Sequence, residues 1–317
     1  MAFFGGGTTT TPATTDIKDV ELMDPPGDSI SCLDFSPTAD YLAVGSWNNE
    51  EGNKVFSGGA DKAGRMFDVQ TGQATQIAAH DAPIKCVKWI DAQGGILATG
   101  SWDKTLKYWD TRQSTPVAKV DLPDRCYTMD VTYPLLVVGT AERHIQMFNL
   151  NSPTTAYRTM VSPLKWQTRV ISCFTTANGF AVGSIEGRVA IQYVDEKDSS
   201  LNFSFKCHRK DQGTTKDNTH VFAVNDMSFH PVHGTFSTAG ADGTINFWDK
   251  DSKTRLKTFD QAPGPISCTA FNKTGSLFAY AVSYDWSKGY SGMTPDHPNK
   301  VMLHVTKDEE IKRRPKK

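Results

Sequence analysis

Residues 96–110 read Ile96-Leu-Ala-Thr-Gly-Ser-Trp-Asp103-Lys-Thr-Leu-Lys-Tyr-Trp-Asp110. The stretch holds an apolar run that ends in small residues, a polar turn, and a second run that ends in an aromatic residue followed by Asp. Short segments with alternating apolar and polar positions, bounded by Gly, Asp or Asn, are typical of half-buried β-strands. The stretch therefore predicts a strand, a turn and a second strand.

The same pattern recurs along the chain. Clear copies lie at residues 55–68 and 236–249, weaker copies at 137–149 and 181–193, and strands of the small-residue type open and close the series at Tyr41–Ser46 and Leu277–Ser283. A unit of about 40–45 residues with this pattern is a small twisted sheet that cannot bury its faces alone. Such units stack radially and close a ring. The repeat length and the strand-ending Trp-Asp predict an all-β WD-repeat β-propeller.

The spacing of the repeat is interrupted once. The glycines near the ends of the small-residue strands are separated by 13, 42, 39, 44 and 57 residues, and they are Gly45, Gly58, Gly100, Gly139, Gly183 and Gly240. The stretch between Ser46 and Lys54 is too short for the outer two strands of one blade and the inner strand of the next, so about 30 residues are missing from the first two blades. Two outcomes stay open. Tyr41–Ser46 and Lys54–Gly59 pair into one irregular blade of six, or a seven-bladed ring keeps a defective position.

The two ends of the repeat region predict how the ring closes. Val20–Met23 precedes the first inner strand, and it is the candidate partner for the last strand, Val301–Val305. Pairing them would hide an open sheet edge. The predicted organisation is therefore a Gly/Thr-rich tail at residues 1–15, a propeller at residues 16–306 and a basic tail at residues 307–317, with a basic run at Lys312–Lys317.

Composition excludes several classes of protein. The chain has 34 basic and 35 acidic residues and a net charge of −1, so any nucleic-acid contact must come from a local patch. No apolar run approaches the roughly 20 residues of a membrane helix, and the first residues lack the basic and apolar regions of a signal peptide. The chain is expected to need no membrane insertion.

Six cysteines raise the question of disulfides or metal. None falls into a C-x-x-C pair, and the adjacent Cys207 and His208 would point to opposite faces of a strand. The other five are expected to share one packed position in the inner strands, in a reduced intracellular compartment. They are Cys32, Cys86, Cys126, Cys173 and Cys268. No metal site and no cofactor is predicted.

One blade holds residues that resemble a catalytic set. His80, Asp103, Trp109 and a strand hydroxyl, Ser101 or Thr99, fit a buried hydrogen-bond chain of the kind that satisfies polar atoms inside a blade. Ser, His and Asp are also the groups of a hydrolase triad. The chain lacks the G-x-S-x-G motif and any phosphate-binding glycine loop, so we predict a structural network and no enzyme.

Candidate binding residues lie in one loop and among scattered basic positions. Tyr284-Asp-Trp-Ser-Lys-Gly-Tyr290 places an aromatic residue between an acidic and a basic residue, a composition typical of interface hot spots. The alternative is that Trp286 packs over its own blade. The candidates for partner or RNA contact are Tyr284, Asp285, Trp286, Lys288, Phe247, Lys250, Arg209 and Lys210.

Several longer stretches carry a specific resemblance. They are Gln76–Ile84, Thr99–Lys107, Gly183–Ile191, Phe205–Arg209, Phe229–Gly234, Phe247–Asp251 and Ser283–Gly289. Over residues 16–311 the chain resembles the nuclear-pore mRNA export factors of the WD-repeat family, and among them a fungal member. The resemblance implies a seven-bladed propeller in the nucleus and at the nuclear pore, shuttling to the cytoplasm. It also implies an FG nucleoporin bound through its GLEBS motif, contact with single-stranded RNA and, in some members, a mitotic spindle role.

Two other functions stay in view. The related mitotic checkpoint propellers bind GLEBS-like motifs in checkpoint kinases, although the stretches Ser283–Gly289 and Glu186–Ile191 favour the export factors. An enzyme on a propeller scaffold is disfavoured because no catalytic constellation was found. The shortened stretch between Ser46 and Lys54 departs from the family pattern in the first two blades.

Overall fold

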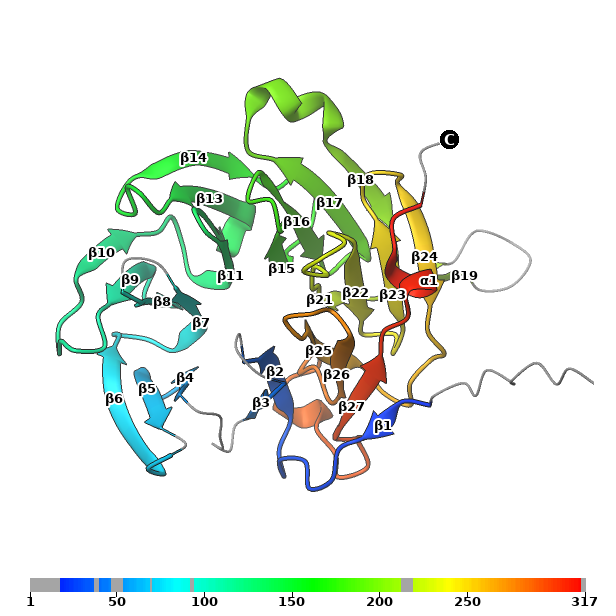
Figure 1. Ribbon diagram of the computed structural model, residues 1–317, viewed down its shortest axis with the longest axis horizontal. Coiled ribbons are helices and arrows are strands. Elements are labelled where there is room, and N and C mark those ends of the chain that lie inside the picture. The colour runs from blue at the N-terminus through cyan, green and yellow to red at the C-terminus, as the bar shows by residue number, and fades with distance from the viewer. Residues whose placement is uncertain are drawn as a thin grey trace, which may run out of the picture.

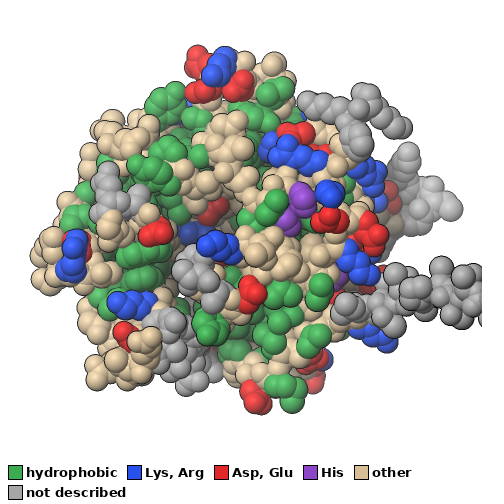
Figure 2. Space-filling view, viewed as in Figure 1, with side chains coloured by type: hydrophobic (Ala, Val, Ile, Leu, Met, Phe, Trp, Pro, Cys, Tyr) green, Lys and Arg blue, Asp and Glu red, His purple; other side chains and the backbone are tan. Residues whose placement is uncertain are grey.

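The computed structural model describes residues 18–36, 40–46, 54–68, 70–91, 94–211 and 219–314. They form a ring of antiparallel sheets in which each inner strand lies near the axis and the later strands follow outward (Figure 1). No helix among these residues has the length and apolar character needed to cross a bilayer. On the face shown in Figure 2, acidic and basic side chains are interspersed and do not gather into one patch.

Five sheets of the ring have four strands each. Four of them are continuous in sequence: β7 (Ile84–Ile90), β8 (Ile96–Ser101), β9 (Thr105–Trp109) and β10 (Ala118–Asp121); β11 (Cys126–Thr132), β12 (Leu135–Thr140), β13 (His144–Asn149) and β14 (Ala156–Val161); β15 (Thr168–Cys173), β16 (Gly179–Ser184), β17 (Arg188–Tyr193) and β18 (Phe203–Lys206); and β21 (Val224–Asp226), β22 (Phe236–Gly240), β23 (Ile245–Asp249) and β24 (Thr254–Thr258). The repeat pattern therefore predicted the fold class correctly.

The fifth sheet joins the two ends of the chain and confirms the predicted closure. It comprises β25 (Ile266–Phe271), β26 (Leu277–Val282), β27 (Lys300–Val305) and β1 (Val20–Glu21). β1 pairs antiparallel with β27, with Val20 opposite Leu303, and the N–H of Leu22 donates to the carbonyl of Val301 at 2.8 Å. The N-terminal strand thus covers the outer edge of the last blade.

The C-terminal boundary at residue 306 is wrong. A short helix, α1 (Asp308–Ile311), buries Ile311 against β23 and β24, and the Thr235 hydroxyl donates to the Ile311 carbonyl at 2.7 Å. Arg313 follows, with its Nη1 2.9 Å from Asp251 Oδ2. An apolar side chain inside the predicted basic tail holds this segment on the ring. Residues 1–17 and 315–317 lie outside the described residues.

The first two blades are incomplete in the way that the glycine spacing predicted. β2 (Ile30–Phe35) and β3 (Leu42–Ser46) form a two-stranded sheet, and β4 (Lys54–Gly58), β5 (Ala63–Asp68) and β6 (Gln73–Ala79) form a three-stranded one. Among the described residues, the former has no outer strands and the latter has no inner strand.

The proposed pairing of the two orphan strands is wrong for the described residues. β3 pairs with β2, β4 pairs with β5, and each short sheet packs on a different neighbour, β2 on β25 and β4 on β7. These separate packing partners hold the two sheets apart. Within the part of the chain that the structure describes, the ring therefore has seven blade positions, two of which are incomplete.

Smaller elements lie outside the blades. A two-stranded ribbon, β19 (Arg209–Asp211) and β20 (Thr219–Val221), follows β18. Three short 3₁₀ helices, η1 (Ala141–Arg143), η2 (Glu196–Leu201) and η3 (Tyr290–Gly292), lie in connecting segments.

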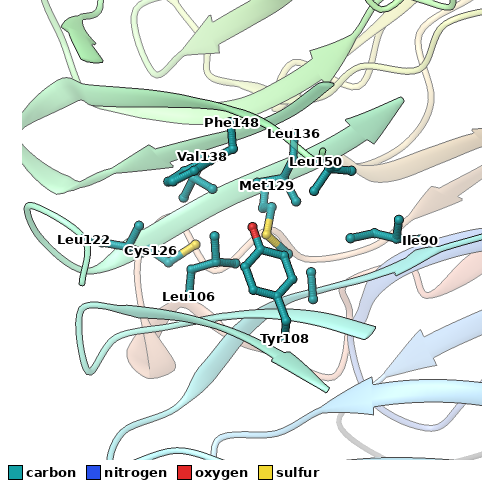
Figure 3. Close-up of a cluster of buried hydrophobic side chains, with 11 residues drawn as sticks. Ile90, Leu106, Tyr108, Leu122, Cys126, Met129, Leu136, Val138, Phe148 and Leu150 are labelled. Carbon is teal, nitrogen blue, oxygen red and sulfur yellow. The ribbon is translucent and has the colours of Figure 1, made fainter. Parts of the chain in front are cut away.

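Apolar side chains fill the interfaces between neighbouring blades. Figure 3 shows one such cluster, in which Leu106 and Tyr108 of one blade meet Met129, Val138 and Phe148 of the next. Burying one side chain of this size stabilises the fold by about 1.5–3 kcal/mol, which is why adjacent sheets stabilise each other.

The inner strands share one irregularity that fixes their equivalence. Each has a β-bulge after its first residue, and the first paired residue beyond it is Cys32, Cys86, Thr128, Val170, Asp226 or Cys268. The expected single cysteine position is therefore confirmed for three of the five and wrong for Cys126 and Cys173. Cys126 precedes the bulge, where its Sγ would lie 2.5 Å from a Cβ on Gly100. A small residue is needed at that contact.

Candidate binding surface around the loop after β26

The buried polar chain predicted in the third blade is present. His80 Nδ1 lies 2.8 Å from Asp103 Oδ2, and His80 Nε2 lies 2.7 Å from Thr99 Oγ1, which also accepts a hydrogen bond from Trp109 Nε1 at 2.8 Å. Burial lowers the pKa of His80 despite the hydrogen bond from its ring to Asp103. Both ring nitrogens therefore have partners within the blade.

Ser101 was predicted as a member of this chain, and it joins the chain only through Asp103, whose N–H donates to the Ser101 hydroxyl at 3.1 Å. That hydroxyl donates to the carbonyls of Ala82 and Pro83, at 3.0 and 2.9 Å, and so fixes the turn before β7. Thr99 connects His80 to Trp109, because its side chain lies between them on β8.

A second polar chain of the same kind was missed in the sequence. His208 contacts Asp242 at 2.9 Å and Thr238 at 2.9 Å, and Thr238 accepts from Trp248 Nε1 at 2.9 Å. The same residue types are present, but His208 and Asp242 are 34 residues apart whereas His80 and Asp103 are 23 apart, so the repeat spacing did not reveal the second chain.

The loop between β26 and β27 is built around a buried tyrosine. Tyr284 is buried, its hydroxyl donates to the Gly289 carbonyl at 2.9 Å, and it accepts from the Lys288 N–H at 3.2 Å. Its ring stacks on His297 with centroids 4.7 Å apart. Tyr284 therefore acts as a support for the loop and is not itself a contact residue.

The next residue anchors the same loop to two other blades. Asp285 is buried, and its Oδ2 accepts from Asn225 Nδ2 of β21 at 3.2 Å. Its backbone carbonyl accepts from Arg169 Nη2 of β15 at 2.9 Å, and its Oδ1 accepts from the Ser287 N–H at 3.1 Å. The acidic flank predicted at the surface is therefore an internal anchor. Its partners Arg169 and Asn225 were not predicted as positioning residues.

Trp286 is the aromatic side chain that this anchored loop presents. It is 36% exposed, and its backbone has φ = 58°, in the left-handed region that side-chain-bearing residues seldom occupy. Such a conformation persists where surrounding contacts fix it, and it is common at ligand-contacting positions. Lys288 and Tyr290 follow, both exposed. The loop therefore brings to the surface a partly exposed indole, whose ring centroid lies 5.7 Å from that of Tyr284, and the side chain of Lys288.

Two basic candidates, Arg209 and Lys210, are consecutive residues of β19 and contact different neighbours. Arg209 donates from Nη2 to the Glu186 carbonyl at 2.7 Å and from Nε to the Gly187 carbonyl at 3.2 Å. Lys210 donates to Gln261 Oε1 at 2.8 Å. Arg209 is thus held beside the start of β17, and Lys210 beside the β24–β25 connection.

The remaining two candidates do not belong to this surface. Phe247 is fully buried between Phe259, Phe271 and Phe278, so its prediction as a contact residue is wrong. Lys250 contacts Tyr193, the last residue of β17, whereas Arg209 is held beside the start of that strand. The strand is about 17 Å long at 3.3 Å per residue.

Lys250 is also largely shielded from solvent. Its Nζ lies 4.8 Å from the Phe174 ring centroid and 2.7 Å from Asp251 Oδ1. It stabilises the opposite end of the blade.

Comparison with known proteins agrees with this architecture. The family described as "WD domain, G-beta repeat" matches residues 21–50, 72–110 and 212–249. The chain is 52% identical to the "Poly(A)+ RNA export protein" of Schizosaccharomyces pombe, over 100% of this chain and 99% of that protein. It is 53% identical to the "mRNA export factor GLE2" of Chaetomium thermophilum over 98% of both chains, and 41% identical to "Protein Rae1" of Drosophila melanogaster. The chain belongs to the family of WD-repeat mRNA export factors.

This export-factor family also gives an independent measure of the interrupted repeat. The alignment with the Schizosaccharomyces pombe protein spans 353 positions, 36 more than the 317 residues of this chain, all of which it covers. The relative therefore carries at least that many residues that this export factor lacks. The difference agrees with the period of the repeat, which places about 30 missing residues between β3 and β4.

Proposed function

We propose that this export factor is a non-enzymatic adaptor at the nuclear pore, which binds a GLEBS-type nucleoporin hairpin and single-stranded RNA. The observation that carries the proposal is the loop after β26, which presents Trp286 and Lys288 on a backbone anchored to two other blades. The names of its relatives place those proteins in the export of mRNA.

The chemistry of the loop suits both ligands. An indole face can stack on a base or fill an apolar pocket of a protein partner, and stacking on a base is worth about 1–3 kcal/mol. Lys288 can approach a phosphate or a carboxylate. An adaptor role also agrees with the third blade, where both ring nitrogens of His80 hold Asp103 and Thr99 in a structural chain.

Replacing Trp286 tests the proposed contact directly. Trp286→Ala is expected to weaken binding of the nucleoporin hairpin, of RNA, or of both by roughly 30-fold, since loss of a desolvated anchor costs about 2 kcal/mol. Fluorescence anisotropy with each labelled ligand measures the effect. Trp166→Ala is the matched control, because Trp166 is 61% exposed in the connection between β14 and β15. Unchanged affinity for both ligands in a folded Trp286→Ala protein rules out this contact.

The RNA interaction is expected to be weakly sequence-specific and to depend on salt. The net charge is −1, so the contact relies on a few local cations. Each phosphate that they neutralise makes the slope of log affinity against log salt more negative by about 0.7. Titrating single-stranded RNA of two unrelated sequences at several salt concentrations should give similar, falling affinities. A flat salt response, or no binding at low salt, contradicts an RNA role.

Affinity purification from nuclear extract distinguishes the export role from the checkpoint alternative. An adaptor at the pore should recover an FG nucleoporin, and the Trp286→Ala protein should recover less of it. Recovery of checkpoint kinases without a nucleoporin would assign the chain to the other class of GLEBS-binding propeller.

A further inference from the structure

The two incomplete blades leave the inner strands on either side of them under-covered. Val87 of β7 is half-buried, whereas the equivalent residues of four other inner strands are 3–4% exposed; these are Met129, Ile171, Met227 and Thr269. Two residues further along β7, Trp89 is 37% exposed. The side chains of this face therefore lack the cover that a preceding inner strand supplies elsewhere.

The facing side of β2 shows the complementary deficit. Cys32 and Asp34 are exposed, whereas the residues equivalent to them in the other inner strands are half-buried or buried. Leu33, which points to the preceding blade, is buried. The poorly covered faces of β2 and β7 thus lie on either side of the position of a single inner strand.

Open backbone hydrogen-bonding groups lie between these two faces. Within the described residues β4 pairs with β5 alone. The N–H of Gly59 donates to Ala63 at 3.1 Å, so alternate residues Ser57 and Val55 also face β5, and Phe56 directs its N–H and C=O to the other edge. The ring of Phe56 stacks on Trp89, with centroids 4.9 Å apart and planes 7° apart. Cys32, Asp34, Phe56, Val87 and Trp89 belong to these two faces and to the open edge of β4, and the space that they border is called here the strand slot.

The complete blades show which chemistry fits between two inner strands. A side chain of one inner strand accepts hydrogen bonds from backbone N–H groups of the next: Thr128 Oγ1 from Ile171 at 2.9 Å, and Asp130 Oδ2 from Cys173 at 2.7 Å. Asp226 Oδ2 accepts from Thr269 in the same way at 2.6 Å. The recurrent link is therefore a carboxylate or hydroxyl that faces the following strand.

The strand slot offers both halves of this link. Val87 and Trp89 stand where Ile171 and Cys173 stand in β15, and Asp34 stands where Asp130 stands in β11. An occupant with hydroxyl and carboxylate groups at alternate positions would accept from β7, and Asp34 would accept a backbone N–H from the occupant. Lys88, which lies between Val87 and Trp89 on β7, is paired with Asp130 of the following blade at 2.8 Å.

We propose that the strand slot binds one extended segment of another protein, which adds to the edge of β4 as a substitute inner strand. The segment has six or seven residues, as the inner strands β2 and β7 do, with apolar residues alternating with Asp, Ser or Thr. Addition of a strand supplies backbone hydrogen bonds for affinity and alternate side chains for specificity. The proposal does not depend on the loop after β26.

A peptide patterned on the chain's own β11 serves as the probe. It carries residues 125–132 with Cys126→Ser, labelled with fluorescein, and it retains the acceptors Thr128 and Asp130. The full-length chain is expected to bind it, and a matched peptide with Thr128→Val and Asp130→Leu is expected to bind at least tenfold more weakly. Hydrogen exchange should show new protection in β4 and β7. Equal binding of the two peptides, or protection confined to other blades, overturns the proposal.

Protein variants locate the site and separate the other possible occupants. Asp34→Ala, at an exposed position, should weaken the probe at least tenfold, while Asp121→Ala on the outer strand β10 should not. A chain lacking residues 1–17 should bind the probe as the full chain does. Binding by the shortened chain alone would make the chain's own N-terminus the occupant, and a concentration-dependent dimer that the probe cannot dissociate would make it a second copy. Either result overturns the assignment to a different protein.

Discussion

Inserting about 36 residues between Ser46 and Lys54, taken from the Schizosaccharomyces pombe relative, is expected to raise the melting temperature of this chain by roughly 4–5 °C. The inserted strands would cover Val87, Trp89 and Cys32, which are less buried than their equivalents in other blades. Covering each large apolar side chain is worth about 1.5–3 kcal/mol, and ordering the new residues offsets part of that gain. A net gain of about 3 kcal/mol corresponds to this shift in a chain of this size.

A linker separates this effect from chain length. A Gly/Ser segment of equal length, inserted at the same point, should leave the melting temperature unchanged or lower it, because it adds chain entropy and no apolar cover. Differential scanning calorimetry of the three proteins is the measurement. Equal stability of all three would show that the two short blades are a tolerated arrangement and that the uncovered side chains cost the fold little.

Stability is expected to fall by about 3 kcal/mol between pH 6 and pH 10 through one histidine. His304 of β27 lies 2.7 Å from Asp19 and 2.9 Å from Glu310, and so links the N-terminal segment, the last blade and α1. Burial alone would lower its pKa, but hydrogen bonds to Asp19 and Glu310 raise the pKa of His304 from 6.5 to about 9. A shift of this size corresponds to about 3 kcal/mol, at 1.36 kcal/mol per unit.

The direction follows from comparison with the unfolded chain. The pKa of His304 is higher in the folded state, so its stabilisation is complete below about pH 6.5 and is lost as the pH rises through 9. On the acid side, the same pair holds the pKa of Glu310 at about 2, although burial opposes this, and that contribution disappears as the pH falls through this value. The histidine link is therefore complete between about pH 5 and 6.5.

Chemical denaturation at pH 6 and pH 10 measures this dependence. His304→Gln should lower stability at pH 6 and lose most of the difference between the two pH values. His297→Gln is the control, since His297 stacks on Tyr284 in the loop after β26 and has no carboxylate partner among the described contacts. If the stability of the unmodified chain changed between pH 6 and pH 10 by no more than that of His304→Gln, His304 would not be the source of the pH dependence.

The parts of the fold that could be predicted were those that follow from the repeat pattern and from the closure of the ring. The spacing of Gly45 and Gly58 revealed the incomplete blades, because a fixed period makes a missing segment countable. The pairing of β1 with β27 followed from an exposed edge that needed a partner. α1 was missed because its one apolar side chain, Ile311, stands among charged residues.

The binding surface was harder to predict for two physical reasons. Blades are covered on both faces, so the alternation of β23 does not separate an outward residue from a core residue, and Phe247 proved to be core. The loop after β26 depends on Arg169 and Asn225, which are distant from Asp285 in the sequence. Such contacts have no local pattern. Only the exposed indole of Trp286 carried a compositional signal.

The pairing of β1 with β27 also orders events during synthesis. β1 is among the first strands to leave the ribosome, but its partner β27 is made near the end of synthesis, since residue 20 pairs with residue 303. Until then the outer edge of the last blade does not exist, and β1 remains an unpaired strand that other chains can meet. Contacts so distant in sequence form slowly, because chain entropy is lost before they stabilise the fold. The individual blades can form as they emerge, whereas the ring closes only after translation is nearly complete.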